Sequence, residues 1–125
     1  MSIPKELLYT KEHEWLSNED DNFIIGITSY AQSQLGDIIF LELPEIGDNL
    51  IAGQPFGEIE AVKTVSDLFA PVNGTVIEVN ESLEDSPDKI NNDCYGEGWI
   101  IKIKPDEKID EYNLLDFQAY AKLIE

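Results

Sequence analysis

The architecture of this 125-residue chain is set by residues 57–71, which read GEIEAVKTVSDLFAP. Acidic and apolar side chains alternate over residues 58–61, which is the two-residue period of a half-buried strand. A second short run begins at Val65 and is expected to return as the partner strand. Lys63 is therefore predicted to lie at the tip of a hairpin.

Lys63 is unusual because it is an isolated positive charge in a long acidic stretch. It is the only Lys or Arg between Glu12 and Asp88, a stretch rich in Asp and Glu. The tip lacks the Asn-Gly or Asp-Gly pair that usually forms a tight hairpin turn, which suggests that its residues serve another purpose. An exposed lysine needs no special explanation, and a solvated surface cation is the alternative. An ammonium on a flexible stem is, however, a natural acceptor for an acyl group.

The composition is that of one folded, acidic domain. A chain of 125 residues is long enough for its own core, and 42% hydrophobic residues are ordinary for a globular protein. Eight Lys and no Arg against 26 Asp and Glu give a formal net charge of −18 at pH 7. This charge argues against binding of nucleic acid or anionic membranes and favours docking onto basic protein surfaces. Solubility alone is the alternative explanation.

Few side chains are available for metal binding or nucleophilic catalysis. With a single histidine, His13, and a single cysteine, Cys94, we expect neither a Cys/His zinc site nor a Cys-His catalytic pair, and no internal disulfide. Carboxylate catalysis stays formally open, although no pair among the 26 acids is marked out. No targeting segment is visible, and no apolar run approaches the roughly 18 residues of a membrane span. We therefore expect a soluble, cytoplasmic protein.

The remaining patterning predicts a mainly β chain. Strands are expected over residues 9–17 and 22–28, around an acidic turn, and later over residues 37–43 and 99–103. Glycines and prolines divide residues 45–80 into strands of about five residues, which is typical of a small sandwich or barrel. In the last of these strands the side chains are expected to alternate between the two faces.

Two helices are expected. Thr28 is the predicted N-cap of a short helix over Ser29–Leu35. Residues 81–93 are polar and are expected to form a loop with one helical turn. Apolar residues recur at three- and four-residue steps over residues 109–124, with Asp116 as a cap, which predicts a C-terminal helix that covers a sheet edge.

The sequence resembles a known family, the H proteins of the glycine cleavage system. The matching motifs follow in order over nearly the whole chain: His13-Glu14-Trp15, Gly26-Ile27-Thr28, Tyr30-Ala31-Gln32, Leu35-Gly36-Asp37, Glu42-Leu43-Pro44, Glu60-Ala61-Val62-Lys63, Ser66-Asp67, Ala70-Pro71-Val72-Asn73-Gly74, Val79-Asn80 and Gly96-Glu97-Gly98-Trp99. The resemblance implies a barrel-sandwich hybrid of the lipoyl-domain type, as a single domain over residues 1–125 with a short internal helix and a C-terminal helix.

The resemblance also implies a function. Lys63 holds lipoate in amide linkage in such a protein, which acts as a non-catalytic shuttle for an aminomethyl group. The implied partners are a pyridoxal-phosphate glycine decarboxylase, a tetrahydrofolate-dependent aminomethyltransferase, a flavin dihydrolipoamide dehydrogenase and the enzymes that attach lipoate. We expect a monomer.

In this family the loaded arm folds back into a surface cleft. The resemblance places Glu14 and Asp67 near the amine of the arm, with Ile27 on the apolar side, and a carboxylate is a sound partner for an ammonium. A solvated acid or a turn cap is the alternative for both carboxyls. His13 belongs to the same motif and is expected to make a structural hydrogen bond. Glu12 departs from the small hydroxyl residue expected beside it, at one wall of the cleft.

Three other functions remain as alternatives. The lipoyl domain of a 2-oxoacid dehydrogenase, or a biotin carrier, usually shows Asp-Lys-Ala or Met-Lys-Met at its tip, whereas this chain has Val62-Lys63-Thr64. An H-like protein that donates lipoate to other enzymes would carry the same motifs as a shuttle. A small hydrolase with paired carboxylates would show turnover by the unmodified protein.

Overall fold

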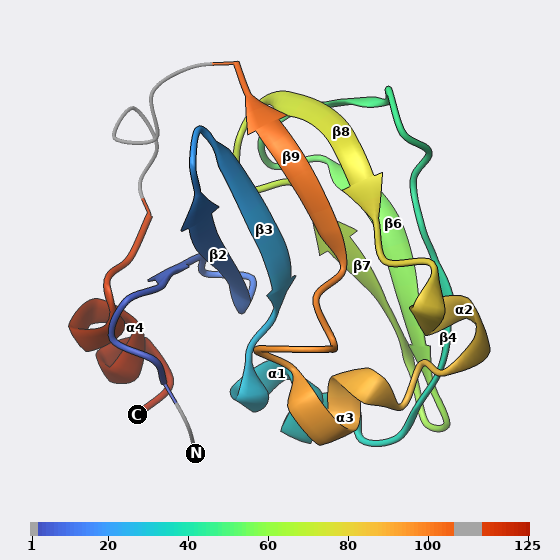
Figure 1. The fold of residues 1–125 in the computed structure, drawn as a ribbon. Helices are drawn as coiled ribbons and strands as arrows, with labels where there is room; N and C mark the ends of the chain where they lie inside the picture. Colours follow the sequence, from blue (N-terminus) through green and yellow to red (C-terminus); the bar gives the residue numbers. More distant parts are fainter. Residues whose placement is uncertain (1–2, 107–113) are drawn as a thin grey trace.

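The computed structural model describes residues 3–106 and 114–125, which fold into two facing sheets and short helices (Figure 1). The larger sheet has the strand order β1-β2-β3-β9-β8-β5, and the smaller sheet has the order β4-β6-β7. The strands are β1 Leu8–Tyr9, β2 Glu14–Glu19, β3 Asn22–Ile27, β4 Ile38–Glu42, β5 Asn49–Leu50, β6 Pro55–Ala61, β7 Val65–Phe69, β8 Gly74–Val79 and β9 Ile101–Pro105. The helices are α1 Ser29–Leu35, α2 Ser82–Asp85, α3 Lys89–Asp93 and α4 Phe117–Leu123.

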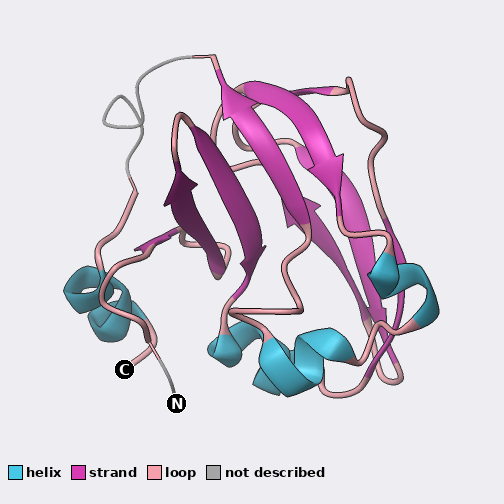
Figure 2. Cartoon of the chain, viewed as in Figure 1, coloured by secondary structure: helices cyan, strands magenta, loops and turns pink. Residues whose placement is uncertain are grey.

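The core lies between the two sheets. Both sheets contribute buried apolar side chains to it, among them Ile25, Val76, Ile103, Leu41, Ile59 and Leu68. The alternation predicted for residues 58–61 is confirmed, since Ile59 and Ala61 are buried while Glu58 is exposed. Figure 2 shows that strands dominate the chain, as the sequence predicted. Among the described residues no helix has the length and apolar character needed to cross a bilayer.

The predicted strand over residues 9–17 is wrong in its middle. The chain turns between β1 and β2, where the His13 N–H donates to the Thr10 carbonyl at 3.1 Å. His13 has a φ of 68°, a left-handed conformation that few residues other than glycine adopt. The following acidic turn is also shorter than predicted, because Glu19 pairs with Asn22.

Two later strands depart from the prediction. A bulge between Val76 and Glu78 shifts the register of β8 against β9, so the alternation predicted for this strand is interrupted. Strand β9 begins at Ile101, two residues after the predicted start. Trp99 precedes it and packs against a separate aromatic cluster, not with the buried isoleucines of β9.

Residues 81–93 are more helical than the predicted loop with one helical turn. They contain α2 and α3, and each short helix buries one apolar side chain, Leu83 in α2 and Ile90 in α3. Single apolar residues separated by polar ones leave no helical period in the sequence. Packing onto the core therefore stabilises these helices, because their intrinsic helix propensity is weak.

The C-terminal helix begins at its predicted cap, since the Asp116 carboxylate accepts a hydrogen bond from the Ala119 N–H at 2.8 Å. Leu115, predicted to be helical, instead pairs with Tyr9 of β1. The ring of Tyr120 stacks on that of Tyr9 with centroids 4.6 Å apart. The segment thus covers the β1 edge of the larger sheet, as predicted (Figure 1). Residues 109–113 of the predicted helix lie outside the described residues.

Candidate functional site

Lys63 lies in the turn between β6 and β7. The turn is closed by a hydrogen bond of 2.8 Å from the Ala61 N–H to the Thr64 carbonyl. The Lys63 side chain is exposed. A closed turn with an exposed side chain combines a fixed attachment point with a free end, which suits a tethered group.

The turn is anchored through a neighbouring segment. The Val62 N–H donates to the Asp37 carbonyl at 3.1 Å. Asn91 of α3 holds both sides of Asp37, because its Oδ1 accepts from the Ile38 N–H at 2.9 Å and its Nδ2 donates to the Gly36 carbonyl at 2.8 Å. In Figure 1 the hairpin tip lies at the same end of the molecule as α1 and α3. A helix that the sequence did not predict therefore supports the attachment point.

Glu14 is a buried carboxyl, with 2% of its surface exposed. It lies in β2 directly opposite Ile27 of β3, so the structure brings these two predicted cleft residues together. Its Oε2 accepts from the Phe69 N–H of β7 at 2.8 Å, and its Oε1 lies 3.5 Å from the Thr10 hydroxyl. Burial raises the pKa of Glu14 to about 8, because the two hydrogen bonds offset only part of the desolvation.

Asp67 is exposed, whereas Glu14 is buried. Asp67 lies in β7 and stands opposite Glu58 of β6, which in turn stands opposite Glu42 of β4. The structure therefore places Asp67 in a row of carboxylates across the smaller sheet. Its link to Glu14 is indirect: Phe69, two residues further along β7, is the residue that Glu14 binds.

His13 makes a structural hydrogen bond, as predicted. Its Nδ1 lies 2.9 Å from the hydroxyl of Tyr120 in α4, and that hydroxyl lies 2.7 Å from Oγ1 of Thr28. Thr28 also caps α1, since Oγ1 accepts from the Ala31 N–H at 3.2 Å. Burial lowers the pKa of His13, so the ring is neutral at pH 7. The three side chains thus join α4, the turn between β1 and β2, and the N-terminus of α1.

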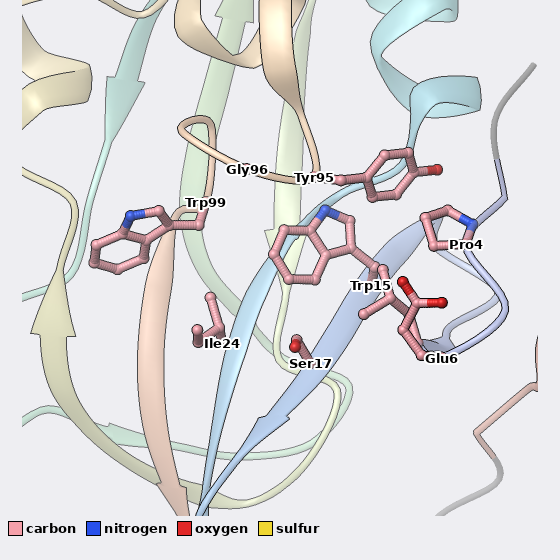
Figure 3. A pocket seen from close by; sticks show the side chains of 9 residues that line it. Pro4, Glu6, Trp15, Ser17, Ile24, Tyr95, Gly96 and Trp99 are labelled. Atoms are coloured by element: carbon pink, nitrogen blue, oxygen red, sulfur yellow. The ribbon is translucent and has the colours of Figure 1, made fainter.

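A separate pocket of about 350 Å³ lies on the outer face of the larger sheet (Figure 3). Trp15, Tyr95 and Trp99 are among the side chains that line it. The Trp15 indole N–H donates to the Cys94 carbonyl at 2.9 Å, and a Cβ at Gly26 would lie 2.6 Å from the indole ring. Trp15 therefore needs a glycine opposite it. The Cys94 thiol is buried, which raises its pKa to about 11 and keeps it protonated.

Within residues 3–106 and 114–125, the His, Cys, Asp and Glu side chains form no group of three or more that could hold a metal ion.

Comparison with known proteins accounts for this arrangement. The family model of the glycine cleavage H-protein matches residues 7–125. The chain belongs to this family. A glycine cleavage system H protein of Listeria monocytogenes serotype 4a (strain HCC23) is 53% identical over 125 residues, which are 100% of both chains. That of Geobacillus kaustophilus (strain HTA426) is 53% identical over 124 residues, 99% of this chain and 98% of the relative.

A solved structure supports the fold. The crystal structure of a glycine cleavage system H protein from Mycobacterium marinum matches with a TM-score of 0.89 and 40% sequence identity, over 96% of this chain and 97% of that one. The predicted barrel-sandwich hybrid of the lipoyl-domain type is confirmed. H proteins are lipoate-bearing shuttles of the glycine cleavage system that have no catalytic activity of their own. The predictions of a carrier and of covalent lipoate on a lysine are confirmed at this level.

Two features of the site were missing from the sequence reasoning. The support that Asn91 gives to the hairpin has no local signal. The second feature is the row formed by Glu42, Glu58 and Asp67. The alternating pattern predicts that Glu58 faces outward, but its alignment with the other two carboxylates depends on strand register, which a single sequence does not reveal.

Proposed function

We propose that Lys63 carries the lipoyl group and that the loaded arm shuttles an aminomethyl group from glycine decarboxylase to aminomethyltransferase. Dihydrolipoamide dehydrogenase then reoxidises the dithiol. The observation that carries the proposal is the exposed Lys63 side chain in an anchored turn, within a family whose members bear lipoate on a lysine. By contrast, Lys102 is held by Glu19 at 2.6 Å and by Glu78 at 3.7 Å. The alternative role as a lipoate donor uses the same lysine and stays a prediction, as do the cytoplasmic location and the monomeric state.

The length of β7 supports a retracted position for the arm. An extended lysyl-lipoyl arm has on the order of a dozen bonds and reaches roughly 14 Å. At about 3.3 Å per residue, the strand from Val65 to Phe69 is about 13 Å long. Lys63 precedes Val65 by two residues, or about 7 Å, so an arm laid back along β7 from Lys63 ends beside Asp67. A bound aminomethyl group extends the arm from there toward Phe69, whose N–H is bound by Glu14.

Glu14 has the right chemistry to meet the amine at that position. It is buried and retains its proton at neutral pH, because its pKa is raised to about 8. An ammonium brought next to it would favour the ionised carboxylate and so lower its pKa. The resulting pair is stabilised only while the arm is retracted, because in the extended position the amine is solvated. Ile27, opposite Glu14, supplies an apolar neighbour.

Intact-mass measurement of the protein from its native host tests the assignment of Lys63. A mass increment that matches a lipoyl amide is expected in the native chain and should disappear in Lys63→Ala. Lys11→Ala is the matched control, because Lys11 is also an exposed lysine in a turn. An increment that maps to any lysine other than Lys63 would refute the assignment.

The lifetime of the loaded carrier tests the retracted position. Water cleaves the aminomethyl thioether to ammonia, formaldehyde and the free thiol, so shielding the arm should slow this loss. Glu14→Ala is expected to hasten release of ammonia about tenfold or more, since a lost charge-assisted contact is worth about 1.5–3 kcal/mol. Asp67→Ala should act in the same direction but more weakly, because Asp67 is exposed. Unchanged lifetimes in both variants would remove these residues from the site.

A further inference from the structure

The outer face of the smaller sheet carries exposed apolar side chains beside the hairpin tip. Phe40 is 56% exposed, Val65 is 53% exposed and Val62 is 68% exposed. Phe40 in β4 stands opposite Glu60 in β6, which stands opposite Val65 in β7. Paired residues share a face of a sheet, so Phe40 and Val65 flank Glu60 on the outer face. Val62 lies next to Lys63 in the turn.

A row of carboxylates lies beside this apolar row. Glu42, Glu58 and Asp67 stand opposite one another in β4, β6 and β7 and line a hollow of about 210 Å³. Like charges at opposed positions destabilise a sheet. In the part of the chain that the structure describes, the ion pairs are formed by Lys102 and involve none of these carboxylates. The row is therefore unneutralised and available to a basic partner.

We infer that this surface is the docking site for the enzyme that attaches lipoate. The surface, called here the hairpin face, consists of Phe40, Val62, Val65, Glu42, Glu58 and Asp67. The partner that fits it presents an apolar depression bordered by Lys or Arg side chains. The inference rests on the proposed function, in which Lys63 is the modified residue.

The reach of the unmodified lysine selects the attaching enzyme as the occupant. A lysine side chain spans five bonds from Cα to Nζ and reaches only roughly 6 Å. The enzyme must place an activated acyl carbon within bonding distance of Nζ, so its surface must lie against the residues beside the turn. After attachment the reactive sulfurs lie roughly 14 Å away, and client enzymes can reach them with less contact to the sheet.

The chemistry of attachment is acyl transfer. The neutral Nζ of Lys63 attacks the carbonyl carbon of a lipoyl adenylate, which the attaching enzyme forms from lipoate and ATP. The amide C–N bond forms, the C–O bond to the adenylate breaks, AMP leaves with the electron pair, and Nζ loses one proton to solvent. The hairpin face contributes orientation and takes no part in bond making.

The experiment measures kcat/KM for acylation of the unmodified chain by an ATP-dependent lipoate ligase with lipoate and ATP. Phe40→Thr combined with Val65→Thr places β-branched residues, which favour strands, at both positions and should lower kcat/KM about tenfold or more, as expected for loss of an exposed aromatic anchor. Glu58→Lys, which relieves repulsion within the sheet, should lower it through slower association, and less so at high salt. Ile46→Thr is the matched control, because Ile46 is 65% exposed outside the hairpin face.

The outcomes separate the two proposals. If the native chain is not acylated at Lys63, the carrier assignment fails whatever the hairpin face does. If the native chain is acylated and both variants react at its rate, the docking inference is overturned and the carrier assignment stands. Variants that are slow with the ligase but, once lipoylated, normal with dihydrolipoamide dehydrogenase support the inference. An equal loss with both enzymes overturns the commitment to the attaching enzyme.

Discussion

At the scale of single residues, Glu14 is placed where an ionised carboxylate is costly, and its proposed role beside the loaded arm depends on this placement. Its carboxyl is removed from water, and its contacts are the Phe69 N–H and the Thr10 hydroxyl, which are neutral donors. Neutral donors offset part of the desolvation but not all of it, so the proton stays bound at neutral pH. Under the proposed function, the amine of the loaded arm is the cation that would favour the ionised form of this carboxyl.

The burial of Glu14 should make folding stability depend on pH. The pKa of this carboxyl is about 8 in the folded chain and 4.5 ordinarily, so between these values the folded state binds more protons than the unfolded state. Its contribution to stability is complete below pH 4.5 and is lost as the pH rises through 8. The free energy of unfolding of Glu14→Gln lacks this pH dependence. Relative to that of the native chain, it should therefore rise by about 1 kcal/mol or more from pH 5 to pH 8, as measured by urea unfolding.

The matched control for this comparison is Asp67→Asn. It makes the same carboxyl-to-amide change at an exposed position, so it should shift the free energy of unfolding almost equally at both pH values. If Asp67→Asn and Glu14→Gln gave the same pH profile, the dependence would belong to the acidic surface as a whole and not to the buried carboxyl.

At the scale of elements, the sequence was sufficient to predict a helix start where a single residue caps the helix by accepting a hydrogen bond from its first turn. Thr28 and Asp116 were predicted as helix caps, and both accept the expected hydrogen bond. The hairpin strands followed from their alternation. Helices α2 and α3 and the break between β1 and β2 could not be predicted, because they depend on burial of Leu83 and Ile90 and on the left-handed His13.

The residues of the site also include some that the sequence predicts and some that it does not. Lys63 could be singled out because its isolated positive charge is visible in the sequence. Glu14 and Ile27 were both named from the family motifs, and the structure pairs them across β2 and β3. The hairpin face could not be recognised, because it exists only when Phe40 and Val65 are aligned through a third strand.

At the scale of the whole molecule, the charge of −18 should govern encounter with client enzymes. Long-range attraction to a basic surface weakens as the Debye length shrinks toward roughly 3 Å at 1 M ionic strength. The apparent Michaelis constant for the carrier in a glycine decarboxylase assay, with glycine saturating, should rise several-fold from low to high salt. The rise should come mainly from slower association. A flat response would show that the acidic surface serves solubility.

The anchored turn that carries Lys63 also bears on the effective concentration of a tethered group at a docked enzyme. With the lipoyl group on Lys63, as proposed, Asn91 and the Asp37 carbonyl would fix the root of the arm and confine its far end to a volume of roughly 14 Å radius. One dithiolane in such a volume corresponds to an effective concentration on the order of 0.1 M. A docked enzyme therefore meets the sulfur as an intramolecular reactant, at a level that free lipoamide in dilute solution does not approach. The carrier concentration that half-saturates the enzyme would then reflect the affinity of docking between the two proteins, and would depend little on the affinity of the enzyme's active site for the dithiolane ring.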